Sequence, residues 1–151
     1  MRRADKEIVN STEIEDILRS GRVCQLGLND GGLTYVVPVN YGYADGCLYV
    51  HSAMEGRKID ILRRNNLVSF SIYIDNGPVQ SDVPCNWGMR YRSVMGTGTA
   101  ELVDGGEEKE EALRIIIKHY AGPASVFEAA KLNSVRIIKI RINSLTGKKS
   151  G

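Results

Sequence analysis

One strand-to-helix junction carries the residues with the clearest chemical potential. Residues 49–58 begin as a strand, end it in the small polar Ser52, and enter a helix at Gly56-Arg57-Lys58. Backbone N–H groups at a helix start carry partial positive charge, a hydroxyl can donate a hydrogen bond, and an arginine fork can grip two phosphate oxygens. The junction therefore predicts an anion site built from Ser52, Arg57 and Lys58. Two solvated cations on a helix surface would give the same pattern.

His51 lies in the same run, one position before Ser52. Neighbouring residues on a strand point to opposite faces, so His51 faces either a ligand pocket or the interior of the sheet. In a pocket its imidazole could donate a proton to a reduced substrate, whereas in the interior it would only satisfy a hydrogen bond. We favour the pocket and name His51 as the candidate catalytic residue. The other histidine, His119, is expected to be structural and to interact with a helix dipole.

Two further segments have the composition of ligand or interface surfaces. Pro38 interrupts the strand pattern of residues 35–43, which indicates an edge strand or a bulge with backbone groups free to face a ligand. Residues 87–94 mix aromatic side chains with arginines, a combination that suits a flat conjugated ligand, a protein interface or an ordinary strand face. No His, Cys and carboxylate cluster has ligand spacing, so no metal is expected. Rossmann and Walker phosphate loops are also missing from the sequence.

The elements that must position these motifs follow from hydrophobic periodicity and turn residues. Strands are expected at residues 23–28, 33–43, 47–52, 67–74, 89–103 and 135–142. Helices are expected at residues 12–21, 56–64 and 107–120, with a further helical piece at 125–131. The long segment 75–88 has little periodicity and is interpreted as a functional loop. These elements predict an α+β, mainly β domain whose six antiparallel strands close into a barrel with peripheral helices.

Length and charge narrow the class of protein. The 151 residues favour a single domain over positions 1–151. A net charge of +2 gives no argument for nucleic acid or a membrane as partner. Because the chain has neither a membrane-spanning apolar run nor a signal-peptide pattern at its start, we expect a cytoplasmic protein. Three cysteines without a Cys-x-x-Cys pair argue against a disulfide framework.

Four sequence blocks, in order and with matching spacing, carry a family resemblance. They are residues 38–43, 48–53, 56–60 and 89–94. Together they resemble the conserved blocks of the nitroimidazole-resistance (Nim) family, which belongs to the pyridoxamine 5'-phosphate oxidase-like flavin-binding proteins. The likeness extends over nearly the whole chain. The C-terminus lacks the substrate-binding segment of the true oxidases, so oxidation of the vitamin is not implied.

The resemblance implies a six-stranded split β-barrel that forms a homodimer with FMN at the interface. It also implies a set of cofactor-binding positions, with the block 91–93 supplied by the same chain or by the partner subunit. These positions are Val37, Pro38, Val39, Asn40, His51, Ser52, Arg57, Lys58, Trp87, Tyr91, Arg92 and Ser93.

Three functions remain open at this point. The leading hypothesis is an FMN-dependent oxidoreductase acting on a small molecule, such as a nitroimidazole or another nitroaromatic compound, with the flavin performing the electron transfer. The second is a non-enzymatic storage or sensor protein that binds FMN, FAD or haem, since relatives of this fold bind several cofactors. The third is a ligand-binding barrel without a redox cofactor.

Overall fold

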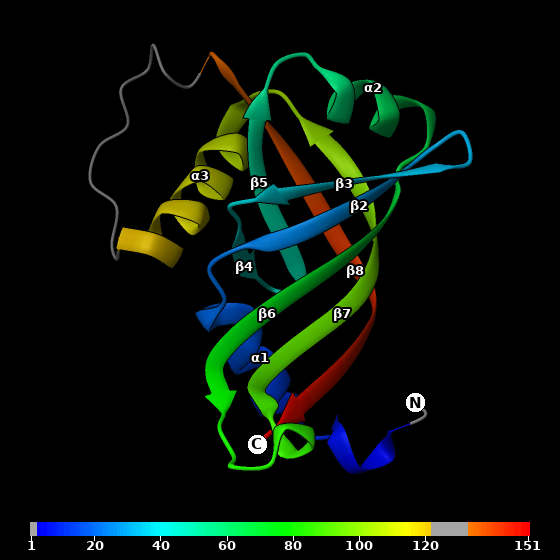
Figure 1. The fold of residues 1–151 in the computed structure, drawn as a ribbon. Coiled ribbons are helices and arrows are strands. Elements are labelled where there is room, and N and C mark those ends of the chain that lie inside the picture. The colour runs from blue at the N-terminus through cyan, green and yellow to red at the C-terminus, as the bar shows by residue number, and fades with distance from the viewer. Residues whose placement is uncertain (1–2, 122–132) are drawn as a thin grey trace.

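A computed structural model describes residues 3–121 and 133–151. Its framework is one antiparallel sheet in which the strands follow the order β3-β2-β6-β7-β8-β5-β4, with β1 added beside β8 (Figure 1). The strands are β1 (Glu7–Ile8), β2 (Cys24–Asp30), β3 (Leu33–Val39), β4 (Gly42–Ala44), β5 (Cys47–Ala53), β6 (Leu67–Val79), β7 (Gly88–Val103) and β8 (Val135–Ser150). The α-helices are α1 (Ser11–Ser20), α2 (Arg57–Arg64) and α3 (Gly106–Ala121), with short 3-10 turns at Ala4–Lys6 and Pro84–Asn86.

The strongly curved sheet encloses the main hydrophobic core. Alternate residues of the strands point inward, as period-2 patterning requires, and α1 and α2 cover opposite ends of this core (Figure 1). Fully buried members include Leu26, Val50, Ile59, Ile72 and Ile138. The helix α3 packs on the other side of β5 and β8 and forms a second, smaller cluster there. The sheet thus has one inner face, an outer region covered by α3, and an outer region that none of the described helices covers.

Tyr41 separates β3 from β4 and joins the sheet to α1. Its side chain is fully buried, and its hydroxyl donates a hydrogen bond to the Leu18 carbonyl at 2.7 Å. Burial raises the pKa of the Tyr41 hydroxyl well above its ordinary value, which keeps the group protonated as a donor. The predicted strand at residues 33–43 is therefore two strands, because Tyr41 turns inward to the end of α1.

The C-terminal end of α3 is tied to the loop between α1 and β2. The Tyr120 hydroxyl donates to the Arg22 carbonyl at 2.6 Å, and His119 Nε2 lies 2.6 Å from the Gly21 carbonyl oxygen. A side chain at Gly21 would meet Ile72 Cγ2 at 2.3 Å, so this junction has no room for one. His119 is thus structural, as expected, but it interacts with a specific carbonyl rather than with a helix dipole.

The α+β, mainly β split-barrel class is confirmed, while the strand count and the closure are corrected. In the described residues there are eight strands instead of six, because residues 33–43 form two strands and a short β1 was not predicted. The sheet is open, since β3 and β4 are its two ends and do not pair with each other. The position of β3 at an edge confirms what Pro38 indicated.

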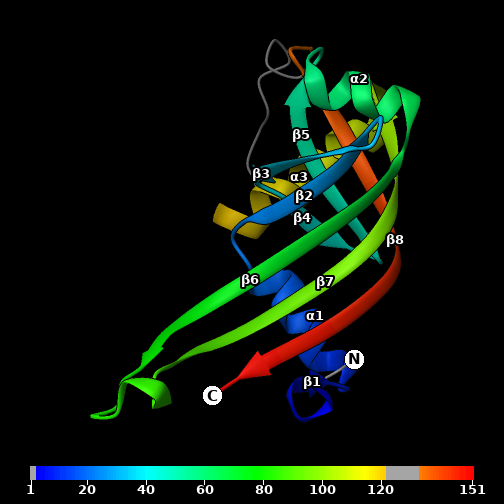
Figure 2. The ribbon, with the colours of Figure 1, turned by 45° about the vertical axis from the view of Figure 1, so that its right-hand side comes forward.

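The segment predicted as a long loop at residues 75–88 is largely a hairpin arm. Strand β6 continues to Val79 beyond a register shift between Asp75 and Pro78, and β7 already begins at Gly88, so the arm projects from the sheet (Figure 2). The last strand continues to Ser150 instead of ending at residue 142, because β7 pairs with residues 144–150 beyond a register shift. Both extensions are rich in polar residues, glycine and proline, which give no strand pattern in the sequence.

The helix predictions at 56–64 and 107–120 are confirmed within one residue at each end. Helix α1 covers Ser11–Ser20 instead of the predicted 12–21, and it is capped by Asn10, whose side chain accepts a hydrogen bond from Thr12 N at 2.9 Å. The helical piece predicted at 125–131 lies outside the described residues. Among the described helices, none combines the length and apolar composition needed to cross a membrane.

Candidate functional site

The start of α2 presents uncompensated backbone donors to open space. Gly56 is the N-cap residue with φ 128° and ψ 174°, a backbone conformation that glycine adopts far more readily than other residues. No side chain of the described residues caps this helix, and apart from the adjacent residues none of their atoms lies within 4 Å of the place where a Gly56 Cβ would stand. The first N–H groups of α2 therefore lack a side-chain acceptor and carry the positive end of the helix dipole, as an anion site requires.

Cations from α2 gather around one carboxylate of β2. Arg57 Nη2 lies 3.3 Å from Asp30 Oδ2, and Arg64 Nη2 lies 2.7 Å from Asp30 Oδ1. The Arg57 guanidinium also lies over the Tyr35 ring, 4.3 Å from its centroid. The Arg57 side chain is 53% exposed, and solvated ion pairs of this kind are worth about 0–1 kcal/mol. Arg57 can therefore leave Asp30 for a phosphate without a large loss of stability.

Ser52 and His51 point to opposite sides of β5. Ser52 is buried and lies on the same side of β5 as the core residues Leu48 and Val50, whereas His51 is exposed. The exposed position removes the interior alternative for His51 and leaves its imidazole accessible to a ligand. The structure thus separates the two residues across the strand, with only Ser52 directed inward, at the end of the core that α2 covers.

The predicted contact residues at β3 also alternate between the core side and the solvent side. Val37 and Val39 pack toward the core, and Pro38 and Asn40 are exposed. A ligand beside this edge would meet the backbone of the two valines rather than their side chains. The free edge of β3 offers that backbone, because β2 pairs with only one side of the strand.

The remaining predicted contacts lie on the hairpin arm and at the near end of β7. Trp87 Nε1 donates to the Ser81 carbonyl at 2.6 Å, and Arg92 Nη1 lies 2.7 Å from Asp16 Oδ2 of α1. Tyr91 and Ser93 are half-buried on the same strand. The arm and α2 lie at opposite ends of the molecule (Figure 1). Within one chain, therefore, the structure does not bring Trp87, Tyr91, Arg92 and Ser93 to the start of α2.

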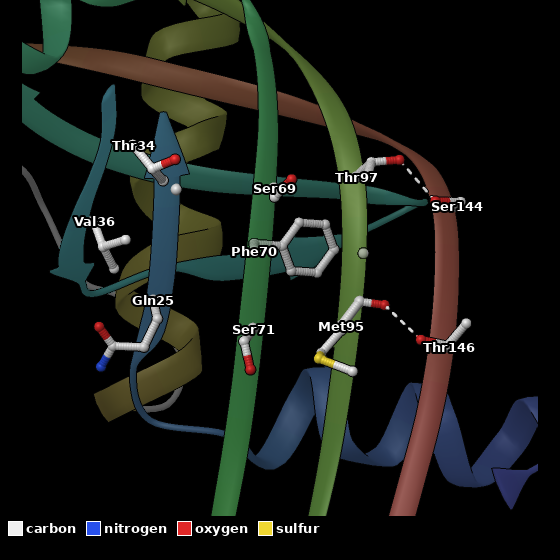
Figure 3. A pocket seen from close by; sticks show the side chains of 12 residues that line it. Gln25, Thr34, Val36, Ser69, Phe70, Ser71, Met95, Thr97, Ser144 and Thr146 are labelled. Carbon is white, nitrogen blue, oxygen red and sulfur yellow. Dashed lines mark hydrogen bonds between the residues drawn. The ribbon is translucent and has the colours of Figure 1, made fainter. Parts of the chain in front are cut away.

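The uncovered outer face of the sheet forms a shallow, uncharged depression that the sequence reasoning missed. Cross-strand pairing aligns its outward side chains in rows, one of which contains Val36, Gly27, Ser69, Thr97 and Ser144 (Figure 3). The depression has a volume of about 470 Å³, and none of its lining residues is charged. Val36 and Met95 on this face are 57% and 48% exposed. The sequence signal for this face is the alternation of uncharged outward residues, Ser69 and Ser71 on β6 and Met95 and Thr97 on β7.

Metal binding has no support in the described residues, where no group of three or more His, Cys, Asp or Glu side chains could hold an ion. Burial raises the pKa of the Cys24 thiol to about 12, so this cysteine is a poor nucleophile and behaves as a small apolar strand residue.

Comparison with known proteins places this geometry in a family. The family model for pyridoxamine 5'-phosphate oxidase matches residues 10–149. A solved candidate 5-nitroimidazole antibiotic resistance protein from Bacteroides thetaiotaomicron is 35% identical, with a TM-score of 0.83 over 94% of this chain and 85% of that chain. No match was found among curated protein sequences.

Two more distant structures share the fold. The flavocytochrome Anf3 from Azotobacter vinelandii is 19% identical, with a TM-score of 0.85 over 100% of this chain and 72% of that chain. An FAD and haem binding protein from Mycobacterium smegmatis is 17% identical, with a TM-score of 0.85 over 96% of this chain and 73% of that chain. The match of the family model over almost the whole sequence shows that the chain belongs to the pyridoxamine 5'-phosphate oxidase-like family.

Proposed function

We propose that this protein is a homodimeric, FMN-dependent oxidoreductase that reduces a nitroimidazole or another nitroaromatic compound. The observation that carries the proposal is the position of β3 between two different surfaces. At Tyr35 this strand meets the cation-bearing start of α2, and at Val36 and Pro38 it borders the uncharged sheet face. A flat ring with a phosphate tail needs both surfaces, the cations for its phosphate and the uncharged face for its ring.

The phosphate end of FMN fits the start of α2. The uncapped N–H groups after Gly56 can donate to phosphate oxygens, Arg57 can offer its fork, and Lys58 adds a point charge. The Ser52 hydroxyl lies at the end of the strand that leads into this helix. Bound FMN would supply electron transfer to the substrate, while the chain supplies the charge and the shape that hold it.

A second copy of the chain completes the proposed site. The uncharged face has the charge depletion typical of interface cores, and Val36 and Met95 would be buried by a partner. The arm and α2 lie at opposite ends of one chain (Figure 1). In the dimer, the partner subunit's Trp87 and the partner subunit's Tyr91 would therefore meet the ring that β3 of the first chain borders.

The proposed substrate class rests on the relative from Bacteroides thetaiotaomicron, at 35% identity over most of both chains. Reduction of a nitro group to a nitroso group takes two electrons and two protons and releases water. In the direct test, photoreduced, FMN-loaded protein is mixed with a nitroimidazole under anaerobic conditions. We expect reoxidation of the flavin together with loss of the nitro absorbance. Flavin that stays reduced would exclude this substrate class.

A non-enzymatic flavin- or haem-binding protein is the second candidate, and the exposed His51 is the observation that favours it. A haem needs an axial ligand, and a histidine nitrogen commonly serves. His119 Nε2 is engaged with the Gly21 carbonyl, so His51 is the histidine with an exposed ring. A haem Soret band in the purified protein would support this candidate over the reductase.

Replacing His51 with glutamine tests its proposed role as proton donor. Glutamine keeps hydrogen-bonding capacity but cannot titrate, so we expect FMN content to remain and nitroimidazole reduction to slow by about 10²–10⁴-fold. Flavin absorbance and substrate turnover are measured separately. The control is Glu55→Gln, a change at an exposed residue of the following turn. Wild-type FMN content and wild-type turnover in the His51 variant would remove His51 from the catalytic site.

A further inference from the structure

A buried arginine at the start of β8 has one guanidinium nitrogen without a hydrogen-bond partner among the described residues. Arg136 is 8% exposed, and its Nε and Nη2 atoms both bind the carboxylate of Asp104, the latter at 3.1 Å. Its Nη1 atom is buried and has no hydrogen-bond partner among the described residues. Because buried charged donors are nearly always satisfied, such a group calls for a partner that the described residues do not supply.

The strand register sets Arg136 directly opposite Ser52. A guanidinium is planar, so when Nε and Nη2 face one carboxylate, Nη1 points away from it. Strand β8 lies between β7, which leads to Asp104, and β5, where Ser52 is the direct cross-strand partner of Arg136. Directly opposed residues carry their side chains on the same face, about 4.5–5.5 Å apart at Cβ. Ser52 is itself only 7% exposed.

The charge of this cluster is not balanced by its own residues. Lys109, 5% exposed, donates from Nζ to the Asp104 backbone carbonyl at 3.2 Å, so two buried cations share one acidic residue. The Asp104 side chain is 57% exposed, and water therefore weakens its compensation of Arg136. The net positive charge of this cluster favours an anion as the missing partner of Arg136 Nη1.

We propose that Arg136 binds a phosphate group together with Ser52, as the inner arm of the anion site at the start of α2. This inference rests on the proposed function when the phosphate belongs to FMN, and free phosphate would offer the same chemistry. Arg57 and Lys58 would hold the group from the solvent side, and Arg136 from the core side. The local sequence around α2 gives no indication of this residue.

Comparing FMN with riboflavin isolates the phosphate contact, because the two ligands differ only in that group. The measured quantity is the ratio of the riboflavin Kd to the FMN Kd, from flavin fluorescence titrations. In Arg136→Met we expect this ratio to fall about tenfold or more, with the riboflavin Kd nearly unchanged. An unchanged ratio in this variant would overturn the proposal.

Asp104→Asn is the matched variant, since it removes the same ion pair but keeps the arginine. Freed from the carboxylate, Arg136 should bind phosphate more strongly, and the ratio should rise by about threefold or more. If Arg136 served only to pair with Asp104, the two variants would move the ratio equally or not at all, and either result would contradict the assignment. Should Arg136→Met fail to fold, the Asp104→Asn ratio decides alone.

Failure of the proposed function would look different. If the wild-type protein binds neither flavin, the FMN assignment falls, and inorganic phosphate becomes the probe in thermal unfolding. A phosphate-dependent rise in the Tm of the wild type that is larger in Asp104→Asn would support a site for free phosphate. No such rise would overturn the site altogether.

Discussion

Replacing Arg57 with alanine should weaken FMN binding about tenfold or more. Each charge-assisted hydrogen bond to a phosphate contributes on the order of 1.5–3 kcal/mol, and 1.4 kcal/mol corresponds to one decade in Kd. The fold should tolerate the change, because Arg57 is 53% exposed and Asp30 retains its contact with Arg64. Quenching of flavin fluorescence on titration measures the affinity.

Arg63→Ala is the matched control for this experiment. Arg63 lies on the same helix and is 55% exposed, but its contact is a long one, 3.9 Å to Asp60, in the final turns of α2. We expect FMN affinity within about twofold of the wild type in this variant. The favourable effect of a helix start on a bound phosphate is confined to the first turn, and Arg63 lies beyond it. Equal affinities in Arg57→Ala and Arg63→Ala would remove Arg57 from the phosphate site.

Placing a carboxylate on the uncharged sheet face should separate the dimer and release the cofactor. In Met95→Glu each subunit would bury an unpaired charge, a change that costs about 2–5 kcal/mol in interfaces. The dimer Kd should rise by roughly 10²-fold or more. Because both subunits contribute to the proposed flavin site, FMN affinity should fall with assembly. Sedimentation velocity at micromolar concentration and the bound flavin per chain are the two readouts.

Val9→Glu provides the comparison for the sheet-face variant. Val9 is 88% exposed, and it follows β1, outside the uncharged face. This change adds the same charge and should leave both the dimer and its flavin in place. A Met95→Glu protein that remains a fully FMN-loaded dimer would show that this face is not the interface.

Local sequence signals predicted the elements but not how far they extend. The helices at 56–64 and 107–120 follow from periodicity and helix-ending residues, and both form as expected. The extensions of β6 and β8 have no such local signal. Their residues are mostly polar or small, and the strands persist because β7 pairs with both of them over most of its length. Pairing between distant segments decides where these strands end.

The same distinction separates the predicted and the missed parts of the site. Gly56, Arg57 and Lys58 are adjacent in sequence, so the junction could be recognised as a possible anion site directly. The Asp30 carboxylate that holds Arg57 could not, because only the packing of α2 against β2 brings them together. Arg136 is even farther from this junction in the sequence, and only the register between β5 and β8 places it opposite Ser52. The opposite orientations of His51 and Ser52 agree with simple strand alternation.

The visible absorption spectrum of the purified protein, combined with its mass in solution, tests the central claim most directly. We expect a flavin spectrum, release of FMN on denaturation, one FMN per chain, and a mass equal to two chains. Apoprotein should regain the same stoichiometry on addition of FMN. A haem Soret band, or a chain that stays colourless and unaltered in its Tm after incubation with excess FMN, would contradict the account.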